Sequence, residues 1–311
     1  MLQTVSKTFF HLLAGSQLLK SAASRYGMRG RGGFARRFIA GETVDEALAA
    51  AKEIQASGLN ITLDLLGESV SSMAEASSAT RNYIGLMESM AAAGVERNIS
   101  LKLTQLGLNV DRATSVDNLR RILEAAATKD FFVRIDMEDS PYTAVTLEVF
   151  ETMWQLGYRN TGPVLQSYLP RSEADAVRMN ELGARVRLVK GAYKEPKHVA
   201  YQSKAEVDAA FVRIMRILLA GGTFPAIATH DPSMLAATRA FALSGGIPPA
   251  NYEFQMLYGI RRDLQADLKT EGFQLRVYVP FGREWFPYFM RRLGERPANV
   301  GFVIRGVLGE R

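Results

Sequence analysis

The segment Leu59-Asn-Ile-Thr-Leu-Asp-Leu-Leu-Gly67 decides the fold, because it has the marks of a short β-strand set between two helices. The run is apolar, contains β-branched residues and ends at a glycine, as strands commonly do. Before it, Thr43-Val-Asp-Glu46 forms a capping-box pattern that opens a helix over residues 47–55, and helical sequence follows over residues 74–93. This order predicts one unit of a parallel βα fold.

The same alternation continues to the end of the chain. Further strands are predicted by short apolar runs at residues 99–106, 131–137, 163–169, 185–189, 225–229, 252–257 and 275–281. Helical periodicity marks the segments between and after them, at residues 116–127, 142–155, 171–182, 204–219, 232–243, 265–268 and 285–293. Eight strands alternating with helices predict a closed (βα)8 barrel of the TIM type, with a last helix over its active site. An open doubly wound sheet is the alternative, but no GxGxxG turn follows the first strand.

The composition defines the broad class of protein. With 311 residues, 47% of them hydrophobic and 23% charged, the chain has an ordinary globular profile, and its length suits one large barrel. The absence of cysteine excludes disulfides, thiolate nucleophiles and cysteine-ligated metals, and it fits a reducing, cytoplasmic compartment. Because the three histidines are scattered and form no HExxH pattern, we predict no metal site.

Positive charge is concentrated in residues 1–41, which we predict to be a helical arm preceding a catalytic barrel over residues 42–311. This arm holds seven of the 38 Lys and Arg residues and none of the 32 Asp and Glu residues, so the rest is nearly neutral. A neutral body argues against a nucleic-acid surface. The arm contains no apolar run near the roughly 20 residues that span a bilayer. It fits packed accessory helices, contact with an anionic membrane surface, or a cleaved targeting segment.

Polar residues at the carboxyl ends of the strands are the candidates for the site, because barrel enzymes carry their catalytic groups there. Lys102 alternates with leucines, so it faces either the lumen, where it needs a counter-charge or an anionic substrate, or the rim. Three acids, Asp136, Glu138 and Asp139, follow the third strand and could together bind a divalent metal or pair with cations. Asp139 precedes Ser-Pro and suits a helix start, which leaves Asp136 as the better candidate.

Later strand ends add groups that suit an anion. Lys190-Gly-Ala192 lets backbone N–H groups approach an anion, or it is an ordinary turn. His230 could bind a ligand or cap a turn. On the last predicted helix, Arg291 and Arg292 suit a carboxylate, unless they form a solvated basic end, and Glu295 shares a face with Arg292. The residues alone thus predict a barrel enzyme with a cationic, carboxylate-binding site.

A set of motifs resembles the proline dehydrogenase family, in its monofunctional bacterial branch. The motifs occur in family order and extend over about residues 40–300: LKLTQLG (101–107), IDMED (135–139), VLQSYL (164–169), VRLVKGAY (186–193), ATH (228–230), YEFQMLYG (252–259), RVYVPFG (276–282) and RRLGERP (291–297). Each motif is weak alone, and together they are specific.

The resemblance implies a barrel with non-covalent FAD that oxidises L-proline to Δ1-pyrroline-5-carboxylate by hydride transfer from C5. Quinone reoxidises the flavin, in the first step of proline catabolism to glutamate. The catalytic residues that the resemblance implies are Asp136, Arg187 and Tyr278. Those implied for substrate are Lys102, Tyr193, Arg291, Arg292 and Glu295. Those implied for FAD are Met137, Gln166, Arg187, Val189, Lys190, Gly191, Ala192, Thr229 and His230.

The resemblance also implies partners. A membrane quinone would accept the electrons, and a pyrroline-5-carboxylate dehydrogenase would use the product. The expected location is the cytoplasm, with peripheral contact at the inner face of the membrane.

Two other functional classes remain open on the sequence. A different barrel enzyme, such as a lyase or aldolase, could use Lys102 as a Schiff base, and flavin absorbance that proline bleaches would exclude it. A non-enzymatic membrane-surface module could use the basic arm, and liposome binding without turnover would indicate that class.

Overall fold

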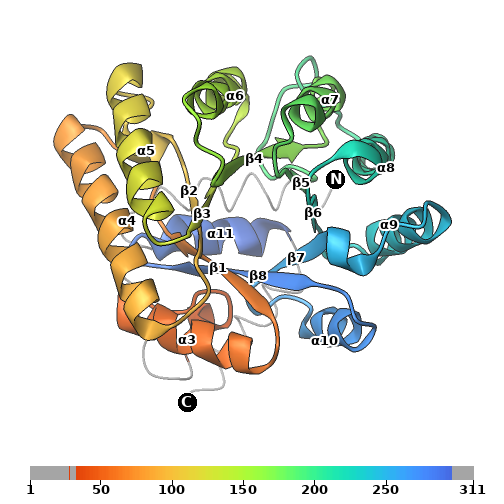
Figure 1. Cartoon of the computed structure of the whole chain (residues 1–311), viewed down its shortest axis with the longest axis horizontal. Coiled ribbons are helices and arrows are strands. Elements are labelled where there is room, and N and C mark those ends of the chain that lie inside the picture. The colour runs from red at the N-terminus through yellow and green to blue at the C-terminus, as the bar shows by residue number, and fades with distance from the viewer. Residues whose placement is uncertain (1–27, 29–32, 296–311) are drawn as a thin grey trace.

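The computed structural model describes Met28 and residues 33–295 of the chain. These residues form a closed barrel of eight parallel strands in sequence order, in which β1 pairs with both β2 and β8 (Figure 1). Helices surround the strands on the outside. The predicted (βα)8 barrel is therefore confirmed, and the open-sheet alternative is excluded.

Every strand and helix predicted for the barrel is present, although the predicted strands at residues 99–106, 131–137 and 163–169 extend past the observed carboxyl ends. The strands are β1 (Asn60–Leu65), β2 (Asn98–Leu101), β3 (Phe132–Ile135), β4 (Thr161–Gln166), β5 (Arg187–Val189), β6 (Ala226–Ala228), β7 (Glu253–Leu257) and β8 (Leu275–Phe281). The helices are α3 (Val44–Ala56), α4 (Met73–Ala93), α5 (Arg112–Ala127), α6 (Ser140–Gln155), α7 (Ser172–Leu182), α8 (Lys204–Gly221), α9 (Pro232–Ser244), α10 (Arg262–Thr270) and α11 (Trp285–Glu295). Short 3-10 turns are η1 (Phe34–Arg37), η2 (Thr104–Leu106) and η3 (Pro249–Asn251).

The end of β2 differs from the prediction, and the difference matters for the site. The strand stops at Leu101, so Lys102 lies in a turn and Thr104 begins η2. The carboxylate of Glu138 accepts hydrogen bonds from the backbone N–H of Thr104, at 3.1 Å, and from its hydroxyl. These bonds replace strand pairing, and they turn the chain so that Lys102 follows the strand rather than alternating within it.

Two environments alternate along each strand. In β1, Ile61 and Leu63 are fully buried in the layer between strands and helices, whereas Thr62 and Asp64 point the other way, into the lumen. The hydroxyl of Thr62 lies 3.3 Å from that of Ser100 on β2. The lumen is polar, because buried Arg134, Arg187, Glu253, Gln255 and Arg276 also occupy it. Its charged groups therefore need partners inside the barrel.

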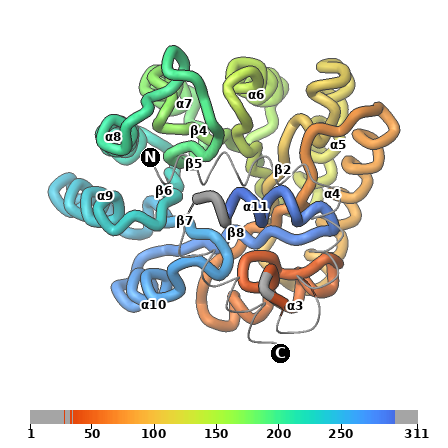
Figure 2. Tube along the Cα trace, turned by 180° about the vertical axis from the view of Figure 1, so that it is seen from behind, coloured from red at the N-terminus to blue at the C-terminus, as the bar shows by residue number. Residues whose placement is uncertain are grey.

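Helix α11 crosses the end of the barrel (Figure 2). It packs against the segment before α3, where the rings of Phe38 and Phe289 lie 6.1 Å apart, and Trp285 donates a hydrogen bond to Glu42 at 2.9 Å. A separate apolar cluster holds these contacts together. The buried, aromatic face of α11 thus fixes its arginines against the strand ends.

The predicted arm, residues 1–41, falls largely outside the described residues, and its boundary stays a prediction. Its last residues join the barrel, because the N–H of Ala40 donates to the carbonyl of Pro280 and the N–H of Gly282 donates to that of Gly41, both at 2.9 Å. Within Met28 and residues 33–295, no helix is long and apolar enough to cross a membrane.

Gly162 in β4 lies where the barrel leaves no room for a side chain. A Cβ at Gly162 would lie 2.1 Å from the carbonyl oxygen of Arg185, which is backbone and cannot move aside easily. We expect Gly162→Ala to lower the free energy of unfolding by about 1–3 kcal/mol. At Gly85, in α4, a Cβ would meet nothing within 4 Å. Gly85→Ala should instead raise stability by roughly 0.5–1 kcal/mol. Urea unfolding of both variants measures these changes. Equal changes in the free energy of unfolding for Gly162→Ala and Gly85→Ala would contradict the prediction.

Candidate active site

A cavity of about 380 Å³ lies at the carboxyl ends of the strands, beneath α11. It brings together residues that the sequence predicted around substrate and flavin: Lys102, Asp136, Met137, Gln166, Arg187, Val189, Lys190, Gly191, Ala192, Tyr193, Thr229, His230, Tyr278, Arg291 and Arg292. Glu295 ends α11, and its side chain lies outside what the structure describes. All the predicted site residues except Glu295 thus line one cavity.

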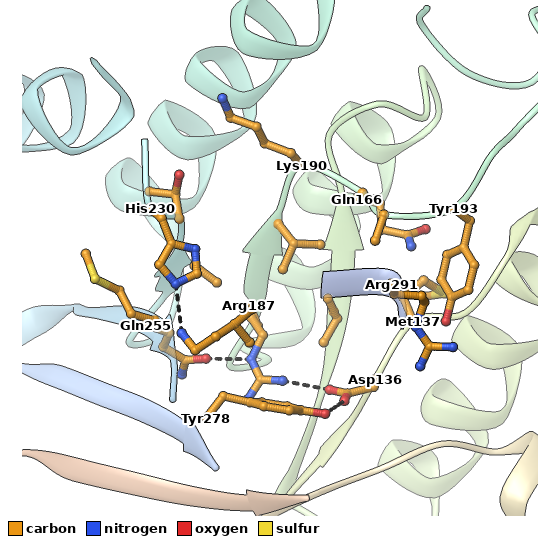
Figure 3. A pocket seen from close by; sticks show the side chains of 18 of the residues that line it. Asp136, Met137, Gln166, Arg187, Lys190, Tyr193, His230, Gln255, Tyr278 and Arg291 are labelled. Carbon is orange, nitrogen blue, oxygen red and sulfur yellow. Dashed lines mark hydrogen bonds and ion pairs between the residues drawn. The ribbon is translucent and has the colours of Figure 1, made fainter. Parts of the chain in front are cut away.

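Arg187 is held at the centre of the cavity by a network of hydrogen bonds (Figure 3). Its guanidinium donates to Asp136 at 2.6 Å, to Gln255 at 2.5 Å and to Ser100 at 3.2 Å. It also lies over the ring of Tyr278, 5.3 Å from the centroid. These contacts give Arg187 a fixed position and a charge that is largely shielded from water.

Tyr278 completes this network from β8. Its hydroxyl donates to the second oxygen of Asp136 at 2.8 Å. Burial, together with the charges of Asp136 and Asp64, raises the pKa of Tyr278 well above its usual value. The phenol therefore stays protonated, and Asp136 accepts hydrogen bonds on both of its oxygens.

Lys102 lies inside the barrel end rather than at the exposed rim. Its side chain is buried, and its Nζ lies 3.7 Å from Oδ2 of Asp64, which is also fully buried. Burial opposes the charged form, but Asp64, Asp136 and Glu68 outweigh it, and the pKa of Lys102 is raised. Lys102 is therefore a charged ammonium in the site.

The arginines of α11 reach the same cavity from above. Arg291 donates to Glu68 at 2.6 Å, and the guanidinium of Arg292 lies 5.1 Å from the ring centroid of Tyr288. Burial opposes the charge of Arg291, but Glu68 outweighs it and its pKa is raised. Burial also raises the pKa of Tyr193 to about 12, so its hydroxyl stays protonated. Three cations and neutral hydroxyls thus face one small cavity, an arrangement that suits a carboxylate ligand.

Asp64 and Glu68 are site residues that the sequence analysis missed. Both lie within or just after the strand that decides the fold, where an acid interrupts an apolar run. Alternation along the strand could have assigned Asp64 to the lumen. Their cationic partners, however, are far away in sequence and could not be assigned before the fold was known.

Lys190 has acidic partners of its own. Its Nζ lies 2.7 Å from Oδ2 of Asp231 and also pairs with Asp208, while Lys204 pairs with the same two acids. Figure 3 shows its side chain directed away from Arg187. Its charge is therefore balanced, which leaves the backbone of Gly191 and Ala192 to face a ligand. Gly191 has φ +109°, and a Cβ there would lie 2.5 Å from the ring of Tyr168, so glycine is required.

Gln166 and His230 present polar atoms to the cavity. The amide nitrogen of Gln166 donates to the carbonyl of Glu138 at 3.3 Å, and its Oε1 has no hydrogen-bond partner within the described residues. Nε2 of His230 accepts the N–H of Leu257 at 2.9 Å, so the neutral ring carries its proton on Nδ1. A buried acceptor without a donor fits a ligand with N–H groups, such as the flat polar ring of a flavin.

The acids after β3 separate instead of sharing a site. Because β3 ends at Ile135, strand alternation does not extend through them, and Glu138 turns to Thr104 while Asp136 faces Arg187. Asp139 occupies the N-cap position of α6 as predicted, but its side chain makes no capping hydrogen bond. In the part of the chain that the structure describes, no group of three metal-ligating side chains is arranged to hold a metal ion.

Comparison with known sequences assigns the family. Residues 47–305 match the family described as proline dehydrogenase. Proline dehydrogenase 1 of Bacillus subtilis (strain 168) is 40% identical over 299 residues, which cover 96% of this chain and 98% of the relative. This chain belongs to the proline dehydrogenase family. Membership makes it an oxidoreductase, as the motifs predicted.

Other members agree in sequence and in fold. The proline dehydrogenase of Deinococcus radiodurans is 42% identical over 278 residues, 88% of this chain and 90% of the relative. The crystal structure of proline utilization A (PutA) from Bdellovibrio bacteriovorus, inactivated by N-propargylglycine, is 31% identical with a TM-score of 0.78. That match covers 84% of this chain and 32% of the longer PutA chain. The proline dehydrogenase barrel thus corresponds to one part of a larger protein there.

The acid pair around Lys190 gives a prediction for this family member. Burial opposes the charge of Asp231, but hydrogen bonds from Lys190 and Lys204 outweigh it and hold its pKa well below 3.8. Asp231 therefore stabilises the fold above that value, and the contribution is lost as the pH falls through the lowered pKa. Asp231 also caps α9 through the N–H of Ser233, a role that asparagine retains. Asp231→Asn should cost about 0.5–1 kcal/mol near neutral pH.

Urea unfolding at several pH values checks this prediction. The difference in free energy of unfolding between Asp231→Asn and the parent chain should shrink below a pH of about 4. Asp111, the exposed N-cap of α5, provides the matched control, because Asp111→Asn also keeps its cap. If the stability difference caused by Asp231→Asn does not change with pH, the charge of Asp231 does not stabilise the fold through Lys190 and Lys204.

Proposed function

We propose that this chain is an FAD-dependent proline dehydrogenase that converts L-proline to Δ1-pyrroline-5-carboxylate. The observation that carries the proposal is one cavity in which Lys102, Arg291 and Arg292 meet a polar wall formed by Gln166 and His230. The cations suit the carboxylate of an amino acid, and the polar wall suits a flavin. Family membership supports both assignments.

The residues present fit a flavin. The unpaired acceptor of Gln166, the backbone of residues 190–192, Thr229 and His230 would hold its polar groups, with Met137 and Val189 in contact with its ring. The chemistry that a bound flavin supplies is acceptance of the hydride from proline C5 and delivery of the electrons to quinone. Arg187 would provide a fixed positive charge where negative charge develops.

The substrate would be oriented by its carboxylate. Lys102, Arg291 and Arg292 would bind it, and this fixes the direction in which C5 points. The ring of Tyr278 and the wall at Tyr193 would pack against the proline ring, and Glu295 would help α11 to close. Asp136 would hold Arg187 and Tyr278 in place, since it accepts from both. Solvent would take the proton that the substrate ammonium loses before hydride transfer.

The visible spectrum tests the proposal directly. The purified protein should show flavin absorbance, and L-proline added without oxygen should bleach it. L-Alanine, which has a carboxylate but no ring, should leave the absorbance unchanged. A colourless protein that cannot be reconstituted with FAD, or a yellow protein that proline does not bleach, would overturn the proposal.

The carboxylate contacts give a quantitative prediction. Removing one charge-assisted contact to a buried carboxylate costs about 2–4 kcal/mol, or roughly 30- to 1000-fold. We expect Arg292→Met to lose that much in kcat/KM for proline and to keep its FAD, because other strands would hold the flavin. Affinity for the carboxylate inhibitor tetrahydrofuroate should fall in parallel.

Arg292→Lys is the matched variant for this experiment. It should recover only part of the loss, because a point charge cannot replace the planar fork of a guanidinium. Near-normal efficiency in Arg292→Met, or unchanged inhibitor affinity, would mean that α11 covers the barrel without binding substrate.

We further propose that the enzyme works in the cytoplasm at the inner membrane face, where its quinone acceptor lies. The charge of residues 1–41 supports contact with anionic lipid. The product is an imine in equilibrium with an aldehyde, so a pyrroline-5-carboxylate dehydrogenase is the natural consumer.

Charge removal in the arm tests the membrane contact. Replacing Lys7, Lys20, Arg25, Arg29 and Arg31 with glutamine should weaken binding to anionic liposomes at least about tenfold, since each cation near the surface contributes up to about 1 kcal/mol. Turnover with a soluble electron acceptor should stay nearly unchanged. Equal sedimentation of both proteins at low salt would contradict a role in lipid binding.

A further inference from the structure

Asp64 is a buried acid that lacks hydrogen bonds within the described part of the chain. Its side chain is fully buried in β1, and neither carboxylate oxygen has a hydrogen-bond partner among the described residues. The nearby hydroxyl of Tyr278 donates to Asp136 instead. A buried carboxylate without hydrogen bonds is costly, so its retention needs a reason.

The other acids near the site have short contacts of their own. Asp136 pairs with Arg187, Glu68 pairs with Arg291, and Glu138 accepts hydrogen bonds from Thr104. The one ion pair of Asp64 in the described residues is with Lys102, at 3.7 Å. This distance is short enough for strong attraction inside a protein but too long for a good hydrogen bond.

The geometry around Lys102 has a chemical consequence. Within the described residues its ammonium donates no hydrogen bond, although it lies at the wall of the cavity. Asp64 therefore balances the charge of Lys102 without occupying its N–H groups. All three donors stay available for an anionic ligand, whereas a shorter salt bridge would occupy at least one of them.

We propose that Asp64 is a positioning residue that keeps Lys102 charged and directs its donors to the substrate carboxylate. The inference rests on the proposed function of the cavity, because it assumes a carboxylate ligand there. Asp64 itself does not line the cavity, so it would act through Lys102.

The surroundings of Lys102 determine what the loss of Asp64 would do. The charged or titratable groups that face it from the packed elements are Asp64 and Tyr278 in the strands, Glu68, Asp136, Glu138 and Tyr193 in the loops after strands, Arg187 in β5 and Arg291 in α11. Burial alone lowers the pKa of a lysine. The other acids near Lys102 already interact with other groups, as Asp136 does with Arg187 and Glu68 with Arg291. If Asp64 is removed, we therefore expect the pKa of Lys102 to fall.

The experiment uses Asp64→Asn, which keeps the shape of the side chain and removes its charge. Binding of tetrahydrofuroate is measured by calorimetry on the FAD-loaded enzyme from about pH 6 to pH 9. The parent enzyme should bind equally well throughout. In Asp64→Asn, affinity should fall with rising pH, by up to about tenfold per pH unit above the lowered pKa of Lys102. Glu96→Gln, which neutralises an acid paired with Arg276 at the opposite, amino end of the barrel, is the control and should keep the flat profile of the parent.

A double-mutant cycle separates positioning from general damage. If Asp64 acts through Lys102, Asp64→Asn should change inhibitor affinity by no more than about twofold in a Lys102→Met background. An equal loss in both backgrounds, or a flat pH profile in Asp64→Asn, would overturn the proposal. A parent enzyme that binds neither proline nor tetrahydrofuroate would instead overturn the proposed function.

Stability provides a second test if Asp64→Asn does not fold. Lys102→Met leaves Asp64 buried without its cation, so its folded-state pKa should rise further above the unfolded value. Stability should then increase as the pH falls toward the unfolded value, since the folded state binds the extra proton. Lys102→Met with Asp64→Asn should be more stable than Lys102→Met alone near neutral pH. If Lys102→Met alone is the more stable of the two variants, the proposed pairing of Asp64 with Lys102 is wrong.

Discussion

The pairing of β1 with β8 closes the sheet, and the rest of the structure depends on that closure. The register sets Thr62 beside Tyr278 and Asp64 beside Pro280, so the first and last strands share one end of the lumen. Tyr278 thereby comes within hydrogen-bonding distance of Asp136, a residue that lies more than a hundred positions earlier. An open sheet would leave these groups at opposite edges.

Closure also creates an interior in which every charge needs a partner. At the amino ends of the strands, Arg276 pairs with Glu253 at 3.0 Å and also with Glu96. Gln255 connects this layer to the site, because its amide donates to Glu253 while its oxygen accepts from Arg187. The position of Arg187 is therefore supported from the bottom of the barrel as well as by Asp136. Such a network favours a fixed charge over a mobile one, which suits electrostatic stabilisation in a reaction.

Helix α11 adds the part of the site that strands alone cannot supply. Its aromatic residues pack on the segment before α3 and bring Arg291 and Arg292 over the cavity. Glu68 meets Arg291 from the loop after β1. The cations that line the cavity thus come from separate parts of the chain, namely the segment after β2 and α11.

The sequence alone determined the barrel, the order of its elements and most residues of the cavity, because helical and strand periodicity and the motifs are local properties. It placed the capping box of α3 correctly, and the structure has the reciprocal bonds between Thr43 and Glu46. It did not foresee that β2 ends before Lys102, that Asp64 and Glu68 pair with site cations, or that Lys190 is balanced by Asp208 and Asp231. Those outcomes depend on contacts between residues far apart in the chain. Only the closed barrel brings such residues together. Each buried charge needs a partner, and the local sequence does not reveal which distant residue supplies it.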